Sequence, residues 1–558
     1  MLQHHRGRAR MTHAVLQLTK SAGGRLTRTF FAAAAFVLLA AALSPAAEPA
    51  VIISVKGFDE LLSDVGYLGE VINQPQVGGL AQAIIGQMTG GQGLKGLDGS
   101  KPIGAYVTLS PEGQPQDIVV FVPVSDQKAF AATLAILSPN TEKVGELTQY
   151  QFQINPNPVF AKAGAKYFFF SPTAESLKET ADPAKLVTVP ADISIEIDLT
   201  KIPDNFKELF LAQTEASANA NSNPSQSEAE QKGQEAGAKL FLAGLRRLTM
   251  DTARLTLSLD INSKVKATVL DLAFAAKSGT PLAQACAGYA KTVSPFAGLV
   301  SKQTVGSYVV STPLSTDAEG ALKLVLDEGE KAGLANLPGE PAAKEAATKM
   351  LKRMAELFRM TVLRGRWDQA VVVNAVDGKL QIVSAMKLAK GDQVGQFFEE
   401  FVKNTPEAKE HVKLNVTQIG KVKVHAITLP PDEDAQKYFG TGPVHVAVND
   451  DTAVIVLGGD SLATLKGALD RPAAPAKAAA ALAPISLRVG MSKILAPLND
   501  FNPSQIPPAI FEQSKSALEG GLDQIALEVT GQPQGLKIRL EVQEGVLRLG
   551  AIAATQNP

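Results

Sequence analysis

The chain of 558 residues contains a single cysteine, Cys286, and therefore has no internal disulfide. Any stable fold must be held together by packing alone. Cys286 lies in a run of small residues, PLAQACAGYA, and no histidine lies near it in the sequence. A thiolate nucleophile needs a basic or cationic neighbour, so we expect Cys286 to be a small buried side chain.

Neither sign of charge is in clear excess, because 54 basic residues face 55 acidic ones. Six of the basic residues, and no acidic residue, lie in the first 46 positions. The rest of the chain then carries 48 basic and 55 acidic residues, a net charge of −7. A mildly acidic protein is poorly suited to neutralising phosphates, so we expect no nucleic-acid binding.

Long apolar runs are also missing. The run Phe30–Leu43 has 14 residues, short of the ~20 that a membrane-spanning helix needs. It follows the basic segment and precedes the small residues Ser44-Pro45-Ala46-Ala47. This order predicts a secretory signal peptide over residues 1–46, and hence a periplasmic or extracellular protein. An uncleaved N-terminal anchor is the alternative, and Met11 is an alternative start.

Histidine is scarce beyond the signal segment, where only His411, His425 and His445 occur. Two strand histidines, His425 and His445, are candidate ligands for one metal ion, but no third ligand stands at a recognisable spacing. We therefore interpret them as half-exposed surface residues. The acidic segments 432–434 and 450–451 lack the spacing of a calcium loop, and we expect no metal or cofactor.

Gly459-Asp460-Ser461-Leu462 spells the block of the GDSL serine esterases, and it follows an apolar strand. The resemblance implies a nucleophile at Ser461 and a base from a later Asp-x-x-His. No histidine follows His445, so the sequence offers no such base. A helix N-cap explains Asp or Ser at this place equally well. We expect no enzyme and no catalytic residue, and keep a hydrolase using Ser461 as an alternative.

Two segments of the chain share one pattern. Residues 158–183 and 443–472 each begin at a proline, run through two apolar strands and enter a helix. Leu177-Lys178 matches Leu465-Lys466 at an offset of 288 residues. Four further pairs of segments follow in the same order: 51–72 with 305–329, 103–124 with 371–388, 193–197 with 485–489, and 255–274 with 525–542.

Alternation of apolar and polar residues in these strands, with short turns between them, predicts antiparallel sheets. The sequence thus predicts an α+β fold of two tandem similar domains, residues 47–300 and 301–558. Each domain is expected to be an antiparallel sheet of hairpins with helices mainly on one face. Residues 213–238 lack apolar side chains and predict a disordered loop or a frayed helix.

The segment from about residue 340 to 359 predicts an amphipathic helix, with an apolar stripe that includes Leu351 and Phe358 and a basic flank that includes Lys352 and Arg353. Such a helix either lies on an anionic membrane surface or packs on a core. We favour core packing, because the matching segment of the first half carries Arg246-Arg247 as well.

The pattern as a whole resembles large exported bacterial proteins of unknown function with a duplicated hairpin–helix architecture, and the resemblance covers most of the chain. It implies no catalytic residues. We expect a non-enzymatic exported protein with a binding or structural role in the periplasm or envelope, where a membrane surface, a lipid or an envelope protein is its partner. A carrier of lipids or other apolar ligands is the main alternative, because duplicated α+β lipid-transfer proteins are broadly similar.

Overall fold

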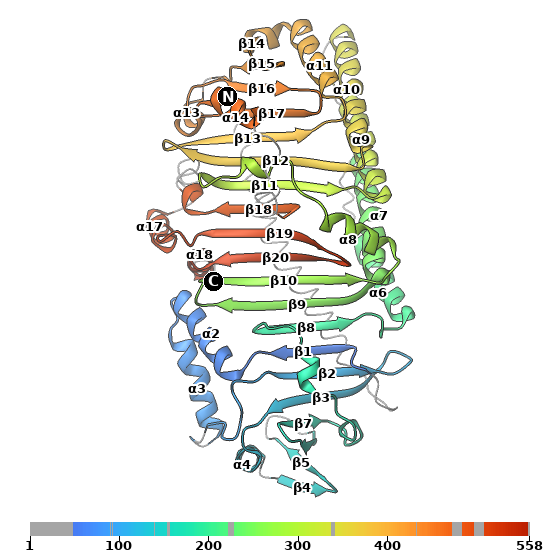
Figure 1. The fold of residues 1–558 in the computed structure, drawn as a ribbon, viewed down its shortest axis with the longest axis vertical. Coiled ribbons are helices and arrows are strands. Elements are labelled where there is room, and N and C mark those ends of the chain that lie inside the picture. Colours follow the sequence, from blue (N-terminus) through green and yellow to red (C-terminus); the bar gives the residue numbers. More distant parts are fainter. Residues whose placement is uncertain are drawn as a thin grey trace.

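The computed structural model describes residues 48–555, except 90, 92, 139, 153–156, 221–227, 336, 338–340, 431, 471–482 and 496–506. The described chain is 40% helical and 34% strand, and its strands form one large antiparallel sheet (Figure 1). The predicted mixture of helices and antiparallel strands is therefore confirmed. The predicted signal peptide, residues 1–46, lies outside the described residues.

The first half of the chain contributes ten strands, which form one half of the sheet. From the middle of the sheet to its end they are β10 (Ala267–Ala276), β9 (Thr252–Asn262), β8 (Ile193–Asp198), β1 (Val51–Val55), β2 (Ile103–Leu109), β3 (Pro115–Pro123), β7 (Tyr167–Ser171), β6 (Val159–Ala163), β5 (Leu147–Gln151) and β4 (Asn140–Val144).

The second half contributes ten more strands. From the middle outwards they are β20 (Gly535–Gln543), β19 (Gln524–Gln532), β18 (Ile485–Gly490), β11 (Thr304–Pro313), β12 (Arg366–Val376), β13 (Lys379–Lys387), β17 (Thr452–Leu457), β16 (Val444–Val448), β15 (Val422–Ile427) and β14 (Val412–Ile419). The order repeats that of the first half, strand for strand.

β10 and β20 pair with each other and join the two halves into one sheet of 20 strands. The pairing runs without a break from Ala267 opposite Gln543 to Ala275 opposite Gly535. The expectation of a separate sheet for each half is therefore wrong. Each of these two strands would otherwise be an edge with unpaired backbone groups, and pairing them satisfies both edges at once.

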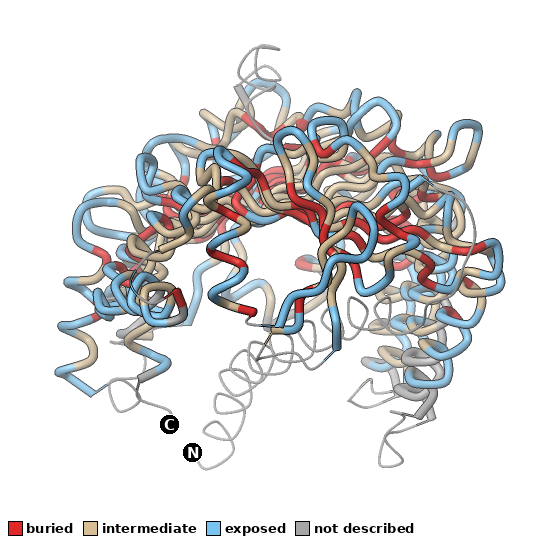
Figure 2. The backbone as a smooth tube through the Cα atoms, turned by 90° about the horizontal axis from the view of Figure 1, so that it is seen from below, coloured by how far each residue is buried: buried red, intermediate tan, exposed pale blue. Residues whose placement is uncertain are grey.

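Helices stand along both long edges of the sheet. One edge carries α2 (Phe58–Val71), α3 (Gln76–Met88), α17 (Pro508–Ala517) and α18 (Glu544–Thr555), and the other carries α6 (Asp204–Ala220), α7 (Glu228–Asp251), α8 (Pro281–Ala290), α9 (Thr316–Ala335) and α10 (Pro341–Val362). Seen along its length, the sheet is an arch, and the two rows of helices stand at its two feet (Figure 2). The sequence predicted that helices cover mainly one face of each sheet. Instead, many of the helices stand along the two long edges.

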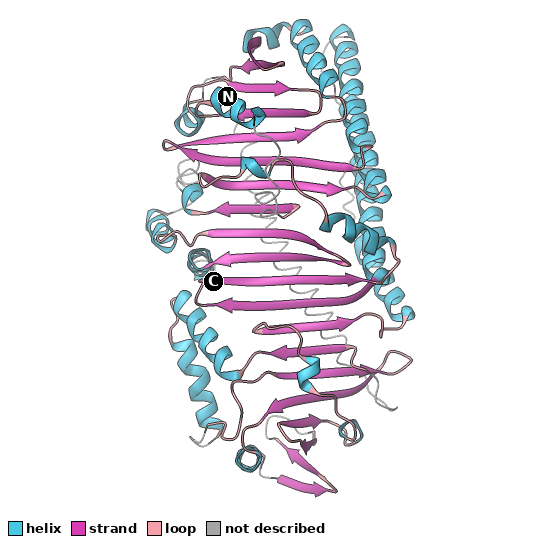
Figure 3. Ribbon diagram, in the orientation of Figure 1, coloured by secondary structure: helices cyan, strands magenta, loops and turns pink. Residues whose placement is uncertain are grey.

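The remaining helices lie towards the two ends of the sheet. They are α4 (Gln127–Leu137), the 3₁₀ turn η1 (Glu175–Leu177), α5 (Pro183–Leu186), the 3₁₀ turn η2 (Ala297–Leu299), α11 (Gly391–Asn404), α12 (Pro406–His411), α13 (Glu433–Phe439) and α14 (Ser461–Asp470). Figure 3 shows that the middle of the sheet has few helices in front of it, between these two covered ends.

Local sequence sets several of these boundaries. The carboxylate of Asp126 accepts hydrogen bonds from the backbone N–H groups of Lys128 and Ala129 and so caps α4. Asp377 and Gly378 join β12 to β13 with φ angles of 50° and 74°. Two successive positive φ angles are the mark of the type I′ turn that Asp-Gly favours, and β12 and β13 form a hairpin around it.

One local prediction needs correction and another is narrowed. The segment 213–238 was expected to be a disordered loop or a frayed helix; residues 213–220 belong to α6 and residues 228–238 to α7, and residues 221–227 lie outside the described residues. The helix expected after Ser171 is only a 3₁₀ turn, Glu175–Leu177. Asp182 then caps the short α5 through the backbone N–H of Ala184, so the chain restarts a helix after the turn.

The buried apolar clusters lie at the two ends of the sheet and at one edge. One cluster includes Tyr106, Phe121 and Leu177, and its counterpart in the second half is built around Val309, Val456 and Leu465. A third cluster lies under α4, and a small one surrounds Cys286 on α8. Among the described residues, the middle strands of the sheet contribute little to these clusters. Neither face of the middle strands therefore carries a large apolar core.

Candidate apolar binding face

The register of the sheet places one apolar residue of each middle strand in a single row. Residues that pair directly across neighbouring strands lie on the same face. Following these pairs gives what we call the apolar ladder: Val55, Ile193, Leu259, Leu270, Leu540, Leu527, Leu487, Tyr308 and Val371. It crosses nine strands from β1 to β12 without a polar residue, apart from the phenol of Tyr308.

A second row runs beside the ladder on the same face, two residues further along each strand. Its members are Ile53, Ile195, Leu257, Leu272, Ile538, Val529, Ile485 and Val310. We call the ladder and this row together the apolar face. The described strand residues on it are uncharged throughout.

The opposite face of the same strands is polar. It carries Glu196, Thr256 and Ser258 on one side of the middle, and Arg539 and Glu528 on the other. The middle of the sheet is thus a single layer with one apolar and one charged surface. An apolar surface of this kind is normally covered by a second layer.

Among the residues that the structure describes, no such layer covers the ladder. The side chains of Ile193, Leu270, Leu527, Leu487 and Tyr308 keep between 36% and 43% of their surface exposed. The other ladder residues are only half-buried. Exposed aliphatic side chains scattered singly need no explanation, but a continuous row of them marks a binding surface.

The apolar face is long and has closed ends. Eight steps between neighbouring strands, each ~4.8 Å, make the ladder ~38 Å long. At one end α4 packs on this face, where the rings of Phe130 and Phe168 lie 5.2 Å apart. At the other end α11 does the same through Phe398 and His425, whose rings lie 5.3 Å apart. The helices at the feet of the arch flank the remaining two sides (Figure 2).

The sequence contains a signal for this face, but that signal does not tell which side of the sheet is covered. Leu255-Thr256-Leu257-Ser258-Leu259 alternates perfectly, and such alternation predicts one buried and one wet face. Which face is covered depends on segments far away in the sequence. The described part of the chain leaves the apolar side uncovered, and this could not be foreseen from the strand pattern alone.

Ser461 lies closer to a histidine than the sequence indicated. Its Oγ is 2.7 Å from Nδ1 of His445, which precedes it in the chain by 16 residues. A candidate base therefore lies upstream of Ser461, although no histidine follows Ser461 in the sequence. Ser461 is the first residue of α14, and the helix cap is Asp460, whose carboxylate accepts a hydrogen bond from the backbone N–H of Ala463.

The proton positions argue against a nucleophile. The Ser461 hydroxyl donates its only proton to the carbonyl oxygen of Pro443, 3.0 Å away, because a carbonyl can only accept. Nδ1 of His445 must then be the donor to Oγ rather than the base that activates it. The side chain of Ser461 is also 3% exposed, out of reach of a substrate. We interpret the pair as an anchor for the start of α14.

The two strand histidines point to opposite faces of the sheet, so they cannot bind one metal ion. His425 pairs with Val446, whereas His445 pairs with Ala426 on the other face. His425 is also not half-exposed, as predicted, but buried beneath Phe398. Its Nδ1 accepts a hydrogen bond from the backbone N–H of Asn415 at 3.3 Å.

The amphipathic helix predicted near residues 340–359 is α10, which packs along α9. Its basic side chains are largely paired. Arg359 donates a hydrogen bond of 2.7 Å to Asp327 and a second to Glu330, both on α9. Arg353 pairs with Glu356 at 2.9 Å. Cations paired in this way fit a packed scaffold helix better than a membrane-surface helix.

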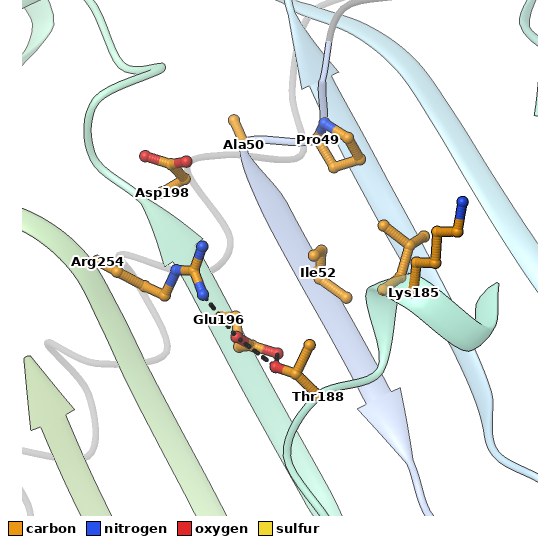
Figure 4. A pocket seen from close by; sticks show the side chains of 9 residues that line it. Pro49, Ala50, Ile52, Lys185, Thr188, Glu196, Asp198 and Arg254 are labelled. Carbon is orange, nitrogen blue, oxygen red and sulfur yellow. Dashed lines mark hydrogen bonds and ion pairs between the residues drawn. The ribbon is translucent and has the colours of Figure 1, made fainter. Parts of the chain in front are cut away.

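A small hollow lies on the polar face, between α5 and the strands β1, β8 and β9 (Figure 4). The buried carboxylate of Glu196 accepts hydrogen bonds of 3.0 and 3.1 Å from the hydroxyl of Thr188. Arg254 lies 3.9 Å from the same carboxylate. Because these groups satisfy one another, nothing here calls for a ligand.

Within the described residues, no three or more His, Cys, Asp or Glu side chains are grouped so that they could hold a metal ion. No helix in the described part of the chain has the length and apolarity to span a membrane. Cys286 is fully buried on α8, and burial raises the pKa of its thiol. No family model, curated protein or solved structure matches this chain.

Proposed function

We propose that this chain is an exported, non-enzymatic carrier that shields the acyl chains of lipids on its apolar face. The single observation that carries the proposal is the uncovered ladder, which runs from Val55 on β1 to Val371 on β12. The carrier was the alternative to a general binding or structural role in the envelope. The exposed aliphatic row favours it.

The size of the apolar face explains why an occupant is expected. A length of ~38 Å and a width of two side-chain rows, which span three residues or ~10 Å of each strand, give an area of roughly 400 Å². Soluble monomers seldom expose continuous apolar patches of more than a few hundred Å² unless the patch is functional. Covering such a surface with hydrocarbon contributes about 25 cal/mol per Å² of apolar area removed from water.

Acyl chains match this surface in shape and chemistry. A bilayer leaflet holds its chains over about half of the ~30 Å hydrocarbon core, or ~15 Å. The ladder is more than twice as long as this, and it offers no charged group that could bind a polar ligand. Each CH₂ group taken from water contributes about 0.8 kcal/mol, so one chain along the ladder supplies a substantial binding free energy.

We also infer that the chain is a tandem duplication, with residues 47–300 and 301–558 as its two units. The identical strand order on both sides of the β10–β20 pairing supports this inference. The basic and apolar order of residues 1–46 supports export to the periplasm or beyond. A carrier in that compartment meets membrane surfaces and envelope proteins as its partners.

Lipid extraction tests the carrier directly. The full-length precursor is expressed in a bacterium, and the exported protein is purified without detergent and analysed by native mass spectrometry. Bound phospholipid or fatty acid is the expected result. A protein that is lipid-free after this treatment, and that does not take up the fluorescent fatty acid parinaric acid afterwards, would contradict the proposal.

Two neighbouring residues of β9 supply a matched control. Leu257 belongs to the apolar face, and Thr256 points to the polar face. Leu257→Lys places a charge where hydrocarbon would lie and is expected to weaken parinaric acid binding at least tenfold, because a buried unpaired charge is costly. Thr256→Lys is expected to bind as the parent does. Equal binding by both variants, with unchanged far-UV circular dichroism, would count against the apolar face.

A further inference from the structure

Two carboxyl groups meet at the point where α2 leaves the sheet. Asp64, in the middle of α2, is 5% exposed, and Asp192, just before β8, is 0% exposed. Asp192 accepts a hydrogen bond from the backbone N–H of Ile261 and lies 3.4 Å from Nζ of Lys56. Oδ2 of Asp64 has no hydrogen-bond donor among the described residues, and Oδ1 of Asp192 faces only the ammonium group of Lys56, without a well-formed hydrogen bond. A proton on one of the two carboxyls supplies the missing donor.

Acidic groups outnumber cations around Asp64. Asp192 faces it from the start of β8, Glu60 from its own helix, and Lys56 from the end of β1. Asp260 on β9 faces Asp192 in turn. Burial, followed by the neighbouring Asp192, raises the pKa of Asp64 to about 6, with Lys56 opposing the shift and Glu60 adding to it.

The pair lies at the rim of the apolar face. Lys56 directly follows Val55, Asp192 directly precedes Ile193, and these two apolar residues are paired members of the ladder. From there α2 and α3 run along one foot of the arch (Figures 1 and 2). The attachment of α2 to the sheet therefore sets how closely this helical flank stands against the ladder.

The second half keeps the backbone geometry of this place but lacks its charges. Lys56 N–H donates to Asp192 O at 2.9 Å, and Ser311 N–H donates in the same way to Pro484 O at 2.6 Å. Ser311 and Pro484 thus stand where Lys56 and Asp192 stand in the first half. Because Pro484 has no carboxyl group, the helix that follows, α9, has no counterpart of Asp192 to pair with and is an internal control.

We propose that Asp64 and Asp192 form a proton-operated latch, which holds α2 against the sheet when they share a proton and loosens it when both are ionised. The latch regulates access to the apolar face and in that respect rests on the proposed function. The folded state binds this proton more tightly than the unfolded chain does. The stabilisation is therefore complete below the ordinary pKa of an aspartate and is lost as pH rises through about 6.

Amide hydrogen exchange of the lipid-free protein tests the latch, read near pH 5 and near pH 7.5 and corrected for intrinsic exchange rates. A pKa raised from 3.8 to about 6 corresponds to at most ~100-fold in local stability. Protection of residues 58–71 is expected to fall about tenfold between the two conditions. Protection of α9 is expected to stay within about twofold.

Substitutions of single aspartates test whether the Asp64–Asp192 pair causes the pH dependence of α2 protection. Asp64→Asn is isosteric and cannot ionise, so its α2 protection should no longer depend on pH. Asp59→Asn alters an exposed carboxyl on the same helix and should keep the full dependence. Asp192→Asn replaces Asp64→Asn if that variant fails to fold. No fall in the parent protein, an equal fall in α9, or a fall that persists in Asp64→Asn would overturn the latch.

The latch and the carrier can each be contradicted by a result that leaves the other standing. Hydrogen exchange requires no ligand, so a pH-dependent α2 stands even if neither parinaric acid nor a fluorescent phosphatidylcholine binds, and that result would contradict only the carrier. Where the phosphatidylcholine does bind, its release from the parent is expected to be several-fold faster near pH 7.5 than near pH 5. Release that is independent of pH in the parent would overturn the regulatory role.

Discussion

The carboxylate of Asp271 accepts two hydrogen bonds of 2.9 Å from the guanidinium group of Arg539, which follows it by 268 residues in the chain. Asp271 lies on β10 and Arg539 on β20, and the two residues are direct partners in the pairing that joins the halves. Lys537 adds a third contact at 2.8 Å. The strands on either side of this pair follow in the same order to both ends of the sheet.

The pair thus marks the centre of the repeated arrangement. If the two units descend from one ancestor, the ancestral strand met its own copy here, and the same residue would have faced itself. Like charges directly opposite each other are unfavourable, whereas Asp opposite Arg is favourable. The difference between the two halves at this point therefore favours their pairing over the pairing of two identical copies.

Removing this contact should loosen the junction of the halves. Asp271→Asn leaves Arg539 and Lys537 without their carboxylate, and Arg539→Gln removes the two-pronged donor. Because Arg539 is partly exposed, we expect a coupling energy of only about 1 kcal/mol in a double-mutant cycle, from urea unfolding of both single variants and the pair. The exposed pair Lys178–Glu175 should show no measurable coupling.

The pH dependence of this contact has a defined sign. Burial alone would raise the pKa of Asp271, but hydrogen bonds from Arg539 and Lys537 hold it below its ordinary value. A carboxylate with a lowered pKa stabilises the fold above its unfolded value near 3.8 and loses that contribution as pH falls. The parent and Asp271→Asn should therefore converge in stability at low pH. A constant difference from pH 7 to about pH 3.5 would contradict this cause.

The repeated pattern could be predicted from the sequence because it resides in local features. The matched residues Leu177 and Leu465 are both 0% exposed, and each lies under the same strands of its own half. The alternation of apolar and polar residues predicted the strands, and the Asp377-Gly378 turn is likewise a local feature. Only the surrounding helix differs, since Leu177 lies in a 3₁₀ turn and Leu465 in α14.

Long-range relationships could not be predicted in this way. The β10–β20 pairing depends on two strands whose own sequences look like any other half-buried strand. Ser461 and His445 meet because β16 and the start of α14 are adjacent in space, and a rule that seeks a downstream histidine misses them. The carboxyl pair of Asp64 and Asp192 joins a helix to a strand more than a hundred residues later, and neither residue belongs to a recognisable motif.

The matched leucines should be equally important to their halves. Leu465→Ala and Leu177→Ala each remove a fully buried side chain and are expected to cost about 2–5 kcal/mol of unfolding free energy. Leu462→Ala, on the exposed side of α14, should cost less than about 1 kcal/mol. Thermal unfolding followed by circular dichroism measures all three. A Leu177→Ala variant as stable as the parent would show that the two places are not equivalent.

Protonation of His425 should make the protein less stable in mild acid. Burial lowers the pKa of His425 below its ordinary value, although Glu399 pulls it upward. A histidine with a lowered pKa contributes fully above about 6.5, and the fold loses stability as pH drops below that value. Protonation at Nδ1 also removes the acceptor for the Asn415 N–H.

The measurement is the slope of unfolding free energy against pH between about 5 and 7. His425→Gln should flatten this slope, whereas His411→Gln, at an exposed position, should leave it unchanged. The Asp64 latch acts in the opposite direction over the same range. The slope is therefore best compared between the Asp64→Asn variant and the double variant that also carries His425→Gln. Equal slopes in these two proteins would refute the assignment to His425.

Ser461→Ala should destabilise the chain without removing any activity. The substitution leaves Nδ1–H of His445 and the carbonyl of Pro443 without their common partner, which costs about 1–3 kcal/mol for buried polar groups. Asp460→Ala removes the helix cap instead and should cost about 1 kcal/mol. Unfolding in urea measures both. A fluorophosphonate probe should label neither the native parent nor Ser461→Ala. Labelling of the native parent that disappears in Ser461→Ala would show that Ser461 is a nucleophile, and the interpretation of the Ser461–His445 pair as an anchor would fall.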